Sequence, residues 1–318
     1  MTAPTPPSQN PADAHSRGLH RVALLTTCAV LALMFIGAGV TSKGAGMAYP
    51  DWPTSDGHLV NPTGWWQGDL TRGEHGHRLM GWTVGFLAIV LASVCWRCGG
   101  KLRLVGVATL AAIIVQGVLG GLRVTEISTT WAVVHGVWGQ LCFCSACMAA
   151  LLTSRAWAAS CGALVARRTV FFRRGCWLGL ACVFAQLVAG AIFRHFGSRG
   201  ALIAHLLGAV VVILVLSWLA MWVMEQYGGN ALLSRLGRTL AVLIGLQMIL
   251  GGFSFLVTVM GVNASGFIGW ALPSTHLLVG AMILACVLSL TMAGYRVLRE
   301  ADATALQVDG HSATAASL

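Results

Sequence analysis

The chain has 318 residues, of which 57% are hydrophobic and only 9% are charged, and its mean hydropathy is +0.77. A soluble domain carries about 25% charged residues, so this composition excludes a soluble surface and makes the lipid bilayer the expected solvent. The net charge of +10 does not indicate nucleic-acid binding, because the basic residues are spread over several short loops rather than gathered in one patch.

The chain begins with residues 1–20, which are rich in Pro, Ala, Ser and Thr and are expected to form a disordered cytoplasmic tail. Eight apolar stretches follow, each close to the roughly 20 residues that a helix needs to cross a bilayer. They show no strand alternation, and backbone groups in lipid must be satisfied within the segment, so we predict an all-α integral membrane protein of eight transmembrane helices. The stretches cover approximately 22–42, 79–96, 104–122, 131–152, 175–193, 201–224, 239–260 and 270–292.

The distribution of Lys and Arg predicts the orientation of these helices, because basic residues concentrate on the cytoplasmic side. Most of them lie in segments that are inside if the N-terminus is inside. Both termini, including a second tail at 296–318, are therefore expected in the cytoplasm. The long loop from 43 to 72, rich in Trp, Pro and Gly, is expected on the outer side.

An internal repeat divides the chain into two halves. Three of the expected helices carry a glutamine followed four residues later by a glycine, and a histidine follows near the start of the next helix. The pairs are Gln116 with His135, Gln186 with His205, and Gln247 with His276. Four helices per half predict a parallel duplication, with four-helix bundles at 21–160 and 161–295 and a basic seam at 153–174.

Four histidines open the second, fourth, sixth and eighth expected helices, which all run from outside to inside. Ionisable groups inside a membrane are costly and usually functional. Two facing helices that each offer an imidazole can hold a haem iron, and a glycine one turn deeper would leave room for the porphyrin. The expected pairs are His77 with His135 and His205 with His276, and the glycines are Gly81, Gly139, Gly208 and Gly280.

Other metal-binding groups are weighed against this interpretation. A closed zinc site needs four ligands around one ion, whereas the duplication favours two separate sites. His195 is close to the second site in sequence but breaks the pattern, so it is expected to be a loop residue. The motif Cys95-x-x-Cys98 and the cluster Cys142, Cys144 and Cys147 are expected to be buried apolar side chains, and we expect no structural disulfide.

The two halves differ in one carboxylate. Glu74 precedes His77 by three residues and shares its helix face, whereas no acid precedes His205 or His276 at this spacing. A carboxylate beside a bound porphyrin can take a proton or stabilise positive charge; the alternative is a helix-start acid favoured by the helix dipole. We predict that the reaction takes place at the N-terminal site. The C-terminal site is predicted to hold a permanent haem that passes electrons.

These features resemble the haem A synthase family over about residues 22–295. The resemblance rests on Glu74-His-Gly-His77-Arg78, the single histidines that open the later helices, the eight-helix duplicated plan and the stretch 40–53. It implies oxidation of a methyl group of haem O to a formyl group, which gives haem A for cytochrome oxidase. Some members carry a cysteine pair in outer loops; this chain has none there, which places it with the cysteine-free members.

The resemblance also implies roles for individual residues. His205 and His276 would ligate a haem b cofactor, His77 and His135 would flank the substrate haem, and Glu74 would be catalytic. The outer position of Arg78 and Arg123 suits contact with haem propionates. The implied location is the plasma (inner) membrane with the haem sites toward the outer side, and the implied partners are a haem O synthase, a quinone or other electron acceptor, and possible further copies of the chain.

Two other functions stay open at this point. One is a bis-histidine haem b electron carrier between quinone and a partner, without substrate chemistry. The other is a haem-handling or export protein, because such proteins use outer loops rich in tryptophan. Here that loop holds Trp52, Trp65, Trp66 and Asp69, although tryptophan is also enriched at membrane boundaries as an anchor.

Overall fold

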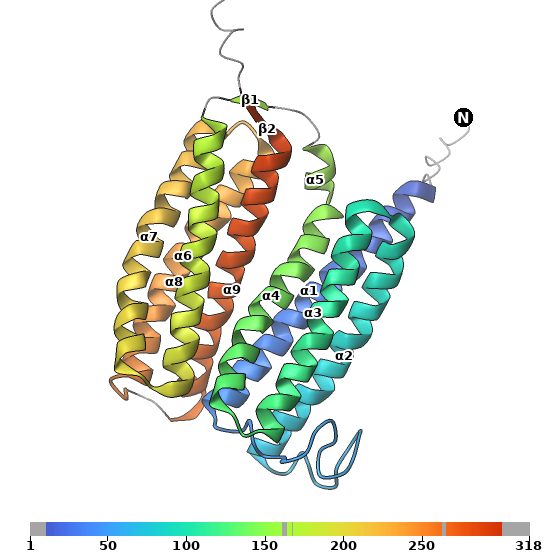
Figure 1. Ribbon diagram of the computed structural model, residues 1–318, viewed down its shortest axis with the longest axis vertical. Coiled ribbons are helices and arrows are strands. Elements are labelled where there is room, and N and C mark those ends of the chain that lie inside the picture. The colour runs from blue at the N-terminus through green and yellow to red at the C-terminus, as the bar shows by residue number, and fades with distance from the viewer. Residues whose placement is uncertain (1–10, 161–163, 167, 263–264, 301–318) are drawn as a thin grey trace, which may run out of the picture.

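The computed structural model describes residues 11–160, 164–166, 168–262 and 265–300 (Figure 1). Within this part of the chain, eight helices are long and apolar enough to cross a membrane. They are α1 (Pro11–Ser42), α2 (Asp69–Cys98), α3 (Gly100–Thr125), α4 (Thr129–Leu152), α6 (Thr169–Phe196), α7 (Arg199–Gln226), α8 (Ala231–Thr258) and α9 (Gly266–Val297). The prediction of an all-α membrane protein with eight spanning helices is confirmed.

The helices form two four-helix bundles, α1–α4 and α6–α9, that lie side by side (Figure 1). The connection between them contains the short helix α5 (Arg155–Ala159) and strand β1 (Leu164–Ala166). Strand β1 pairs in parallel with β2 (Leu298–Glu300), which follows α9 directly. This small sheet ties the segment between the bundles to the end of the last helix.

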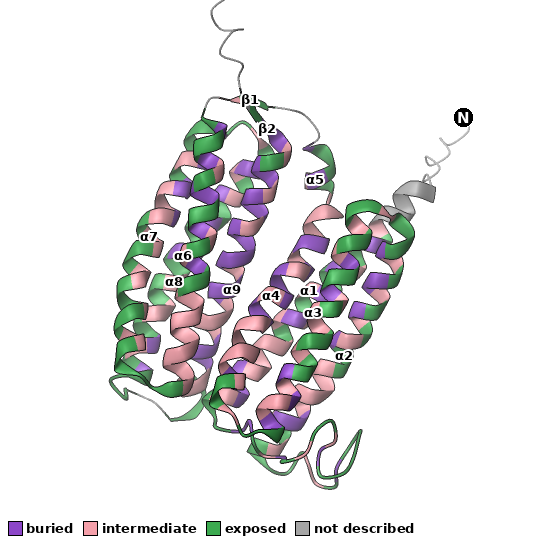
Figure 2. Cartoon of the chain, in the orientation of Figure 1, coloured by how far each residue is buried: buried purple, intermediate pink, exposed green. Residues whose placement is uncertain are grey.

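The core of the molecule follows α9 and the face where the two bundles meet. Helix α9 packs on α6 and α8 of its own bundle and on α1 and α4 of the other. In its most apolar stretch 72% of the residues are buried, against 17% in α3 and in α6 (Figure 2). The exposed apolar side chains of the outer helices, such as Leu104 and Leu214, suit contact with lipid, because lipid tails replace water as solvent.

The ends of the expected helices differ from the observed ones. Helix α1 begins at Pro11, so residues 11–20 are helical and the prediction of a disordered tail is wrong for them. A proline is tolerated in a first helical turn, and a helix can continue beyond its apolar span. The expected second tail is structured as far as Glu300, because β2 pairs with β1. The rest of both expected tails lies outside the described residues.

Candidate functional site

The four histidines lie at one end of the two bundles, the end at which α2, α4, α7 and α9 begin (Figure 1). We call this the histidine end. Each histidine lies roughly two to three turns inside its helix rather than at its first residue, because the helices begin before their apolar spans do. All four side chains are half-buried.

The C-terminal pair has a geometry that fits two ligands of one iron. The ring centres of His205 and His276 are 6.2 Å apart and the ring planes are inclined by 82°. Two imidazoles that ligate one metal ion from opposite sides place their ring centres about 6 Å apart, because each metal–nitrogen bond is about 2 Å long. The two histidines therefore fit a bis-histidine haem.

Each histidine ring packs against a glycine in the helix that precedes its own helix. A Cβ atom added at Gly37, Gly120, Gly190 or Gly251 would lie between 2.6 and 3.1 Å from the Cε1 atom of the ring. The histidines are, in the same order, His77, His135, His205 and His276. Sequence reasoning had found the glycines on α3, α6 and α8 but had not assigned them this role, and it missed Gly37 on α1. The repeated unit is thus a helix pair that occurs four times.

The packing also separates the two nitrogens of each ring. In all four histidines Nδ1 lies nearer than Nε2 to the glycine of the preceding helix. The Nδ1 atom of His205 lies 3.1 Å from the carbonyl oxygen of Gln186. In His205, Nε2 is consequently the nitrogen that is left to ligate an iron. In His135 this atom faces the side-chain amide of Gln116 at 3.3 Å.

The glycines one turn deeper than the histidines do not leave room for a porphyrin as expected, except at Gly81. A Cβ atom at Gly139 or Gly280 would lie 3.2 or 3.3 Å from the side-chain nitrogen of Gln116 or Gln247. Gly208 similarly lies against the side chain of Gln186. These glycines make room for the repeated glutamines, and only Gly81 faces open space.

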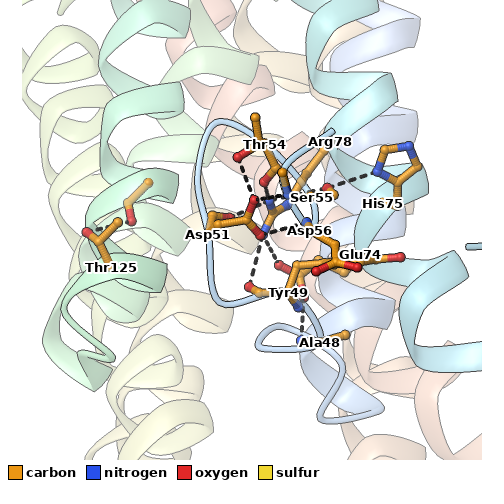
Figure 3. A network of polar contacts seen from close by, with 12 residues as sticks. Ala48, Tyr49, Asp51, Thr54, Ser55, Asp56, Glu74, His75, Arg78 and Thr125 are labelled. Atoms are coloured by element: carbon orange, nitrogen blue, oxygen red, sulfur yellow. Dashed lines mark hydrogen bonds and ion pairs between the residues drawn. The ribbon is translucent and has the colours of Figure 1, made fainter. Parts of the chain in front are cut away.

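The carboxylate of Glu74 holds the long loop between α1 and α2 onto α2 (Figure 3). It accepts hydrogen bonds from the backbone nitrogens of Ala48 at 2.5 Å and Tyr49 at 3.1 Å. Its other oxygen pairs with Nη2 of Arg78 at 2.5 Å, and only 4% of the residue is exposed. Helix α2 begins at Asp69, so Glu74 is not the helix-start acid of the alternative interpretation.

Arg78 and Arg123, the two arginines predicted to contact propionates, differ in how many of their hydrogen-bond donors are free. Arg78 donates to the carbonyl oxygens of Asp51 and Thr54 and to Glu74, so its guanidinium is occupied by the loop. The side chain of Arg123 lies against Gly46, and its guanidinium makes no hydrogen bond or ion pair within the described part of the chain. Its role as a propionate partner stays a prediction, but it is the one of the two with donors to offer.

The loop itself is an ordered structure at the histidine end of the N-terminal bundle. The Asp51 carboxylate accepts hydrogen bonds from the Thr54 hydroxyl and from the backbone nitrogens of Asp56 and Gly57. Desolvation raises the pKa of this carboxyl, but these hydrogen bonds outweigh it and lower the pKa to about 2. The ring of Trp52 packs closely on Gly121 of α3.

His75 is a buried residue of this loop contact that sequence reasoning did not assign. Its Nδ1 lies 2.9 Å from the Ser55 hydroxyl and its Nε2 lies 2.6 Å from the carbonyl oxygen of Val60. The ring of Trp65 lies 4.9 Å from the His75 ring. The only sign of this contact in the sequence is that Glu74, His75 and Arg78 lie close together near the start of one helix. Their spacing does not reveal the folded loop that they hold.

His195 is not a loop residue, contrary to the expectation. It lies in the last turn of α6, which continues to Phe196 because Gly197 takes the left-handed conformation that ends a helix. Its Nε2 lies 3.8 Å from the Cβ position of Gly136 on α4, next to His135. His195 therefore stands where the two bundles meet at the histidine end.

The described residues contain no binding site for a metal ion without a porphyrin. Among them, no group of three or more histidine, cysteine or acidic side chains comes together. A haem iron needs only two protein ligands, because the porphyrin supplies the rest. None of the nine cysteines in the described ranges forms a disulfide, and Cys161 lies outside those ranges. Cys98 is exposed, so the expectation that it is buried is wrong.

The comparisons with known proteins add no family. No family model matches the chain, and a search of curated proteins found no match. What the site can do is therefore argued from its geometry and from the motif resemblance described above.

Proposed function

We propose that this protein is a membrane enzyme of the haem A synthase type, which oxidises a methyl group of haem O to a formyl group. The observation that carries the proposal is the difference between two otherwise equivalent histidine pairs. All four rings pack on glycines in the same way, but only the N-terminal pair has a buried ion pair next to one of its histidines in the helix, Glu74 with Arg78 on α2 beside His77. The ring centres of the C-terminal pair lie 6.2 Å apart, a distance that suits two ligands of one haem iron.

The proposed roles follow from these surroundings. His205 and His276 would hold haem b through Nε2, and the bound haem would supply one-electron transfer. His77 and His135 would orient the substrate haem. Glu74 is held by two backbone N–H groups and by Arg78, so its carboxylate is fixed in place and suited to stabilise developing positive charge.

The proposed setting is the plasma (inner) membrane, with the histidine end on the outer side and both termini in the cytoplasm. A haem O synthase would deliver the substrate, and a quinone or another acceptor would remove the electrons. The basic residues at the opposite end, including Arg97, Lys101 and Arg103, support this orientation, because positive charge concentrates on the cytoplasmic side.

The test is the haem content of cells that express the full chain together with a haem O synthase. We expect hydroxylated and formyl haem in the extract, and neither product with Glu74→Ala. His58→Ala is the matched control, since His58 is exposed in the same loop region and is expected to leave the products unchanged. Extracts that contain haem O alone, from cells in which the wild-type protein is present and haem-loaded, would refute the proposal.

A bis-histidine haem b electron carrier is the second candidate. It is favoured by the contacts of Glu74, whose two oxygens already accept three hydrogen bonds from the protein. This candidate predicts a low-spin haem that a quinol reduces, with no modified haem under any condition. The extraction experiment therefore separates the two functions.

A further inference from the structure

Arg194 joins the two bundles at the histidine end. It lies in the last turn of α6, and its Nη2 donates to the carbonyl oxygen of Ala38 at 2.8 Å and to the hydroxyl of Ser42 at 2.7 Å. Both acceptors belong to α1 of the other bundle and both are neutral. The positive charge of this half-buried side chain is thus placed at the interface without a carboxylate.

Arg123 approaches the same region from the N-terminal bundle. It lies in the last turn of α3 and its guanidinium packs against the backbone of Gly46. It interacts electrostatically with Arg194 and with His195. Since its guanidinium donates no hydrogen bond to any described residue, the planar set of donors on this side chain is free.

The acids at this end are already engaged elsewhere. Glu74 pairs with Arg78, and Asp69 pairs with Lys43 and Arg72. The Asp51 carboxylate is occupied by its own turn. Neither Arg123 nor Arg194 forms an ion pair, although Glu74 lies within electrostatic range of Arg123. Two half-buried arginines that repel each other are costly in a membrane protein, where buried charges are normally paired. This arrangement is that of a site for an anion.

We infer that Arg123 and Arg194, with His195 beside them, form an anion site across the two bundles that binds the carboxylates of a porphyrin held by the histidines. Arg123 lies within electrostatic range of His77 and His135, and Arg194 within range of His276, so carboxylates of a porphyrin at either pair are the nearest anions. A guanidinium matches a carboxylate with two parallel hydrogen bonds. The inference rests on the proposed haem binding. It adds a contact through which both bundles would hold the bound porphyrin.

The experiment compares two porphyrins on the purified full-length protein in detergent, namely iron protoporphyrin IX and its dimethyl ester, which lacks the negative charges. We expect the wild-type protein to bind the free acid at least about tenfold more tightly than the ester. Arg123→Gln and Arg194→Gln should each weaken binding of the free acid about tenfold and leave binding of the ester unchanged. Arg72→Gln is the control, because Arg72 is exposed and paired with Asp69.

Size-exclusion chromatography in detergent reports whether each variant is folded, independently of ligand binding. Arg194→Lys keeps the charge and is expected to recover part of the preference for the free acid. Equal affinity of the wild-type protein for acid and ester would overturn the anion site while leaving haem binding intact. An equal loss of both ligands in folded Arg123→Gln and Arg194→Gln proteins would overturn it as well. Failure to bind either porphyrin would reject the proposed function itself.

Discussion

Individual residues at the histidine end divide into ligands and supports. His205 and His276 offer their rings to each other at a distance that suits one iron between them. Glu74 and Arg78 instead form hydrogen bonds with the loop between α1 and α2 and with each other. Under the proposed function, His205 and His276 should therefore be needed to retain haem b, and Glu74 and Arg78 should be needed for the shape and charge of the proposed substrate site.

Alanine variants of the ligands test this division. His205→Ala and His276→Ala are each expected to lose nearly all bound haem b, because one imidazole no longer meets the iron. Glu74→Ala is expected to keep haem b and lose formation of formyl haem. The measurement is haem content per purified protein together with the low-spin spectrum; retention of haem b in both histidine variants would contradict the assignment.

The Asp51 carboxylate gives the loop a dependence on pH. Its pKa in the folded loop is about 2, below the about 3.9 of an unfolded aspartate, so its stabilising contribution is complete above pH 4 and is lost as the pH falls towards 2. Asp51→Asn removes the charge and should lower the protection of the Asp56 and Gly57 amides about tenfold at neutral pH. Hydrogen exchange measures this, and unchanged protection would show that the charge is dispensable.

At the scale of elements, the unit of construction is a helix pair. One helix brings a glycine, the next brings a histidine, and the ring lies on the bare backbone. Small residues allow such close approach in membranes. A glutamine precedes three of these glycines and faces a second glycine on the histidine helix, so these three helix pairs are in close contact at two levels.

Two glycine substitutions separate ring packing from helix propensity. A Cβ at Gly190 would lie 2.9 Å from Cε1 of His205, whereas a Cβ at Gly245 meets nothing within 4 Å. Gly190→Ala should displace the ring and weaken haem b binding about tenfold, and Gly245→Ala should leave it unchanged while favouring the helix by up to about 1 kcal/mol. Haem titration checks both variants; equal affinities would show that the ring tolerates the methyl group.

At the scale of the whole molecule, two bundles share one long interface. Helix α9 is the most enclosed spanning helix of the described chain, and the anion site proposed above would add a polar contact at the histidine end. The proposed topology puts that end on the outer side of the membrane. His58 lies exposed in the loop there, and Lys101 lies exposed at the opposite end.

Cysteine labelling in intact cells tests the topology. We expect a membrane-impermeant maleimide to react with His58→Cys and not with Lys101→Cys, both made in a Cys98→Ser background because Cys98 is an exposed thiol. Permeabilised cells should label both variants and serve as the control for accessibility. The reverse pattern in intact cells would invert the orientation.

The sequence by itself determined the membrane class, the eight spans, the duplication and the common end of the four histidines. These features depend on apolar length and on periodicity, which are local properties of the chain. It also singled out Glu74, Arg78 and Arg123, because charged residues are rare in such a composition.

Only the tertiary structure decided what these residues touch. The glycines that receive the histidine rings lie on other helices, and the loop that occupies Glu74 and Arg78 is separated from them along the chain. Arg194 and His195 meet Arg123 only because two bundles pack together. Contacts of this kind depend on how helices and loops are placed in space, and the pattern of one helix does not contain that information.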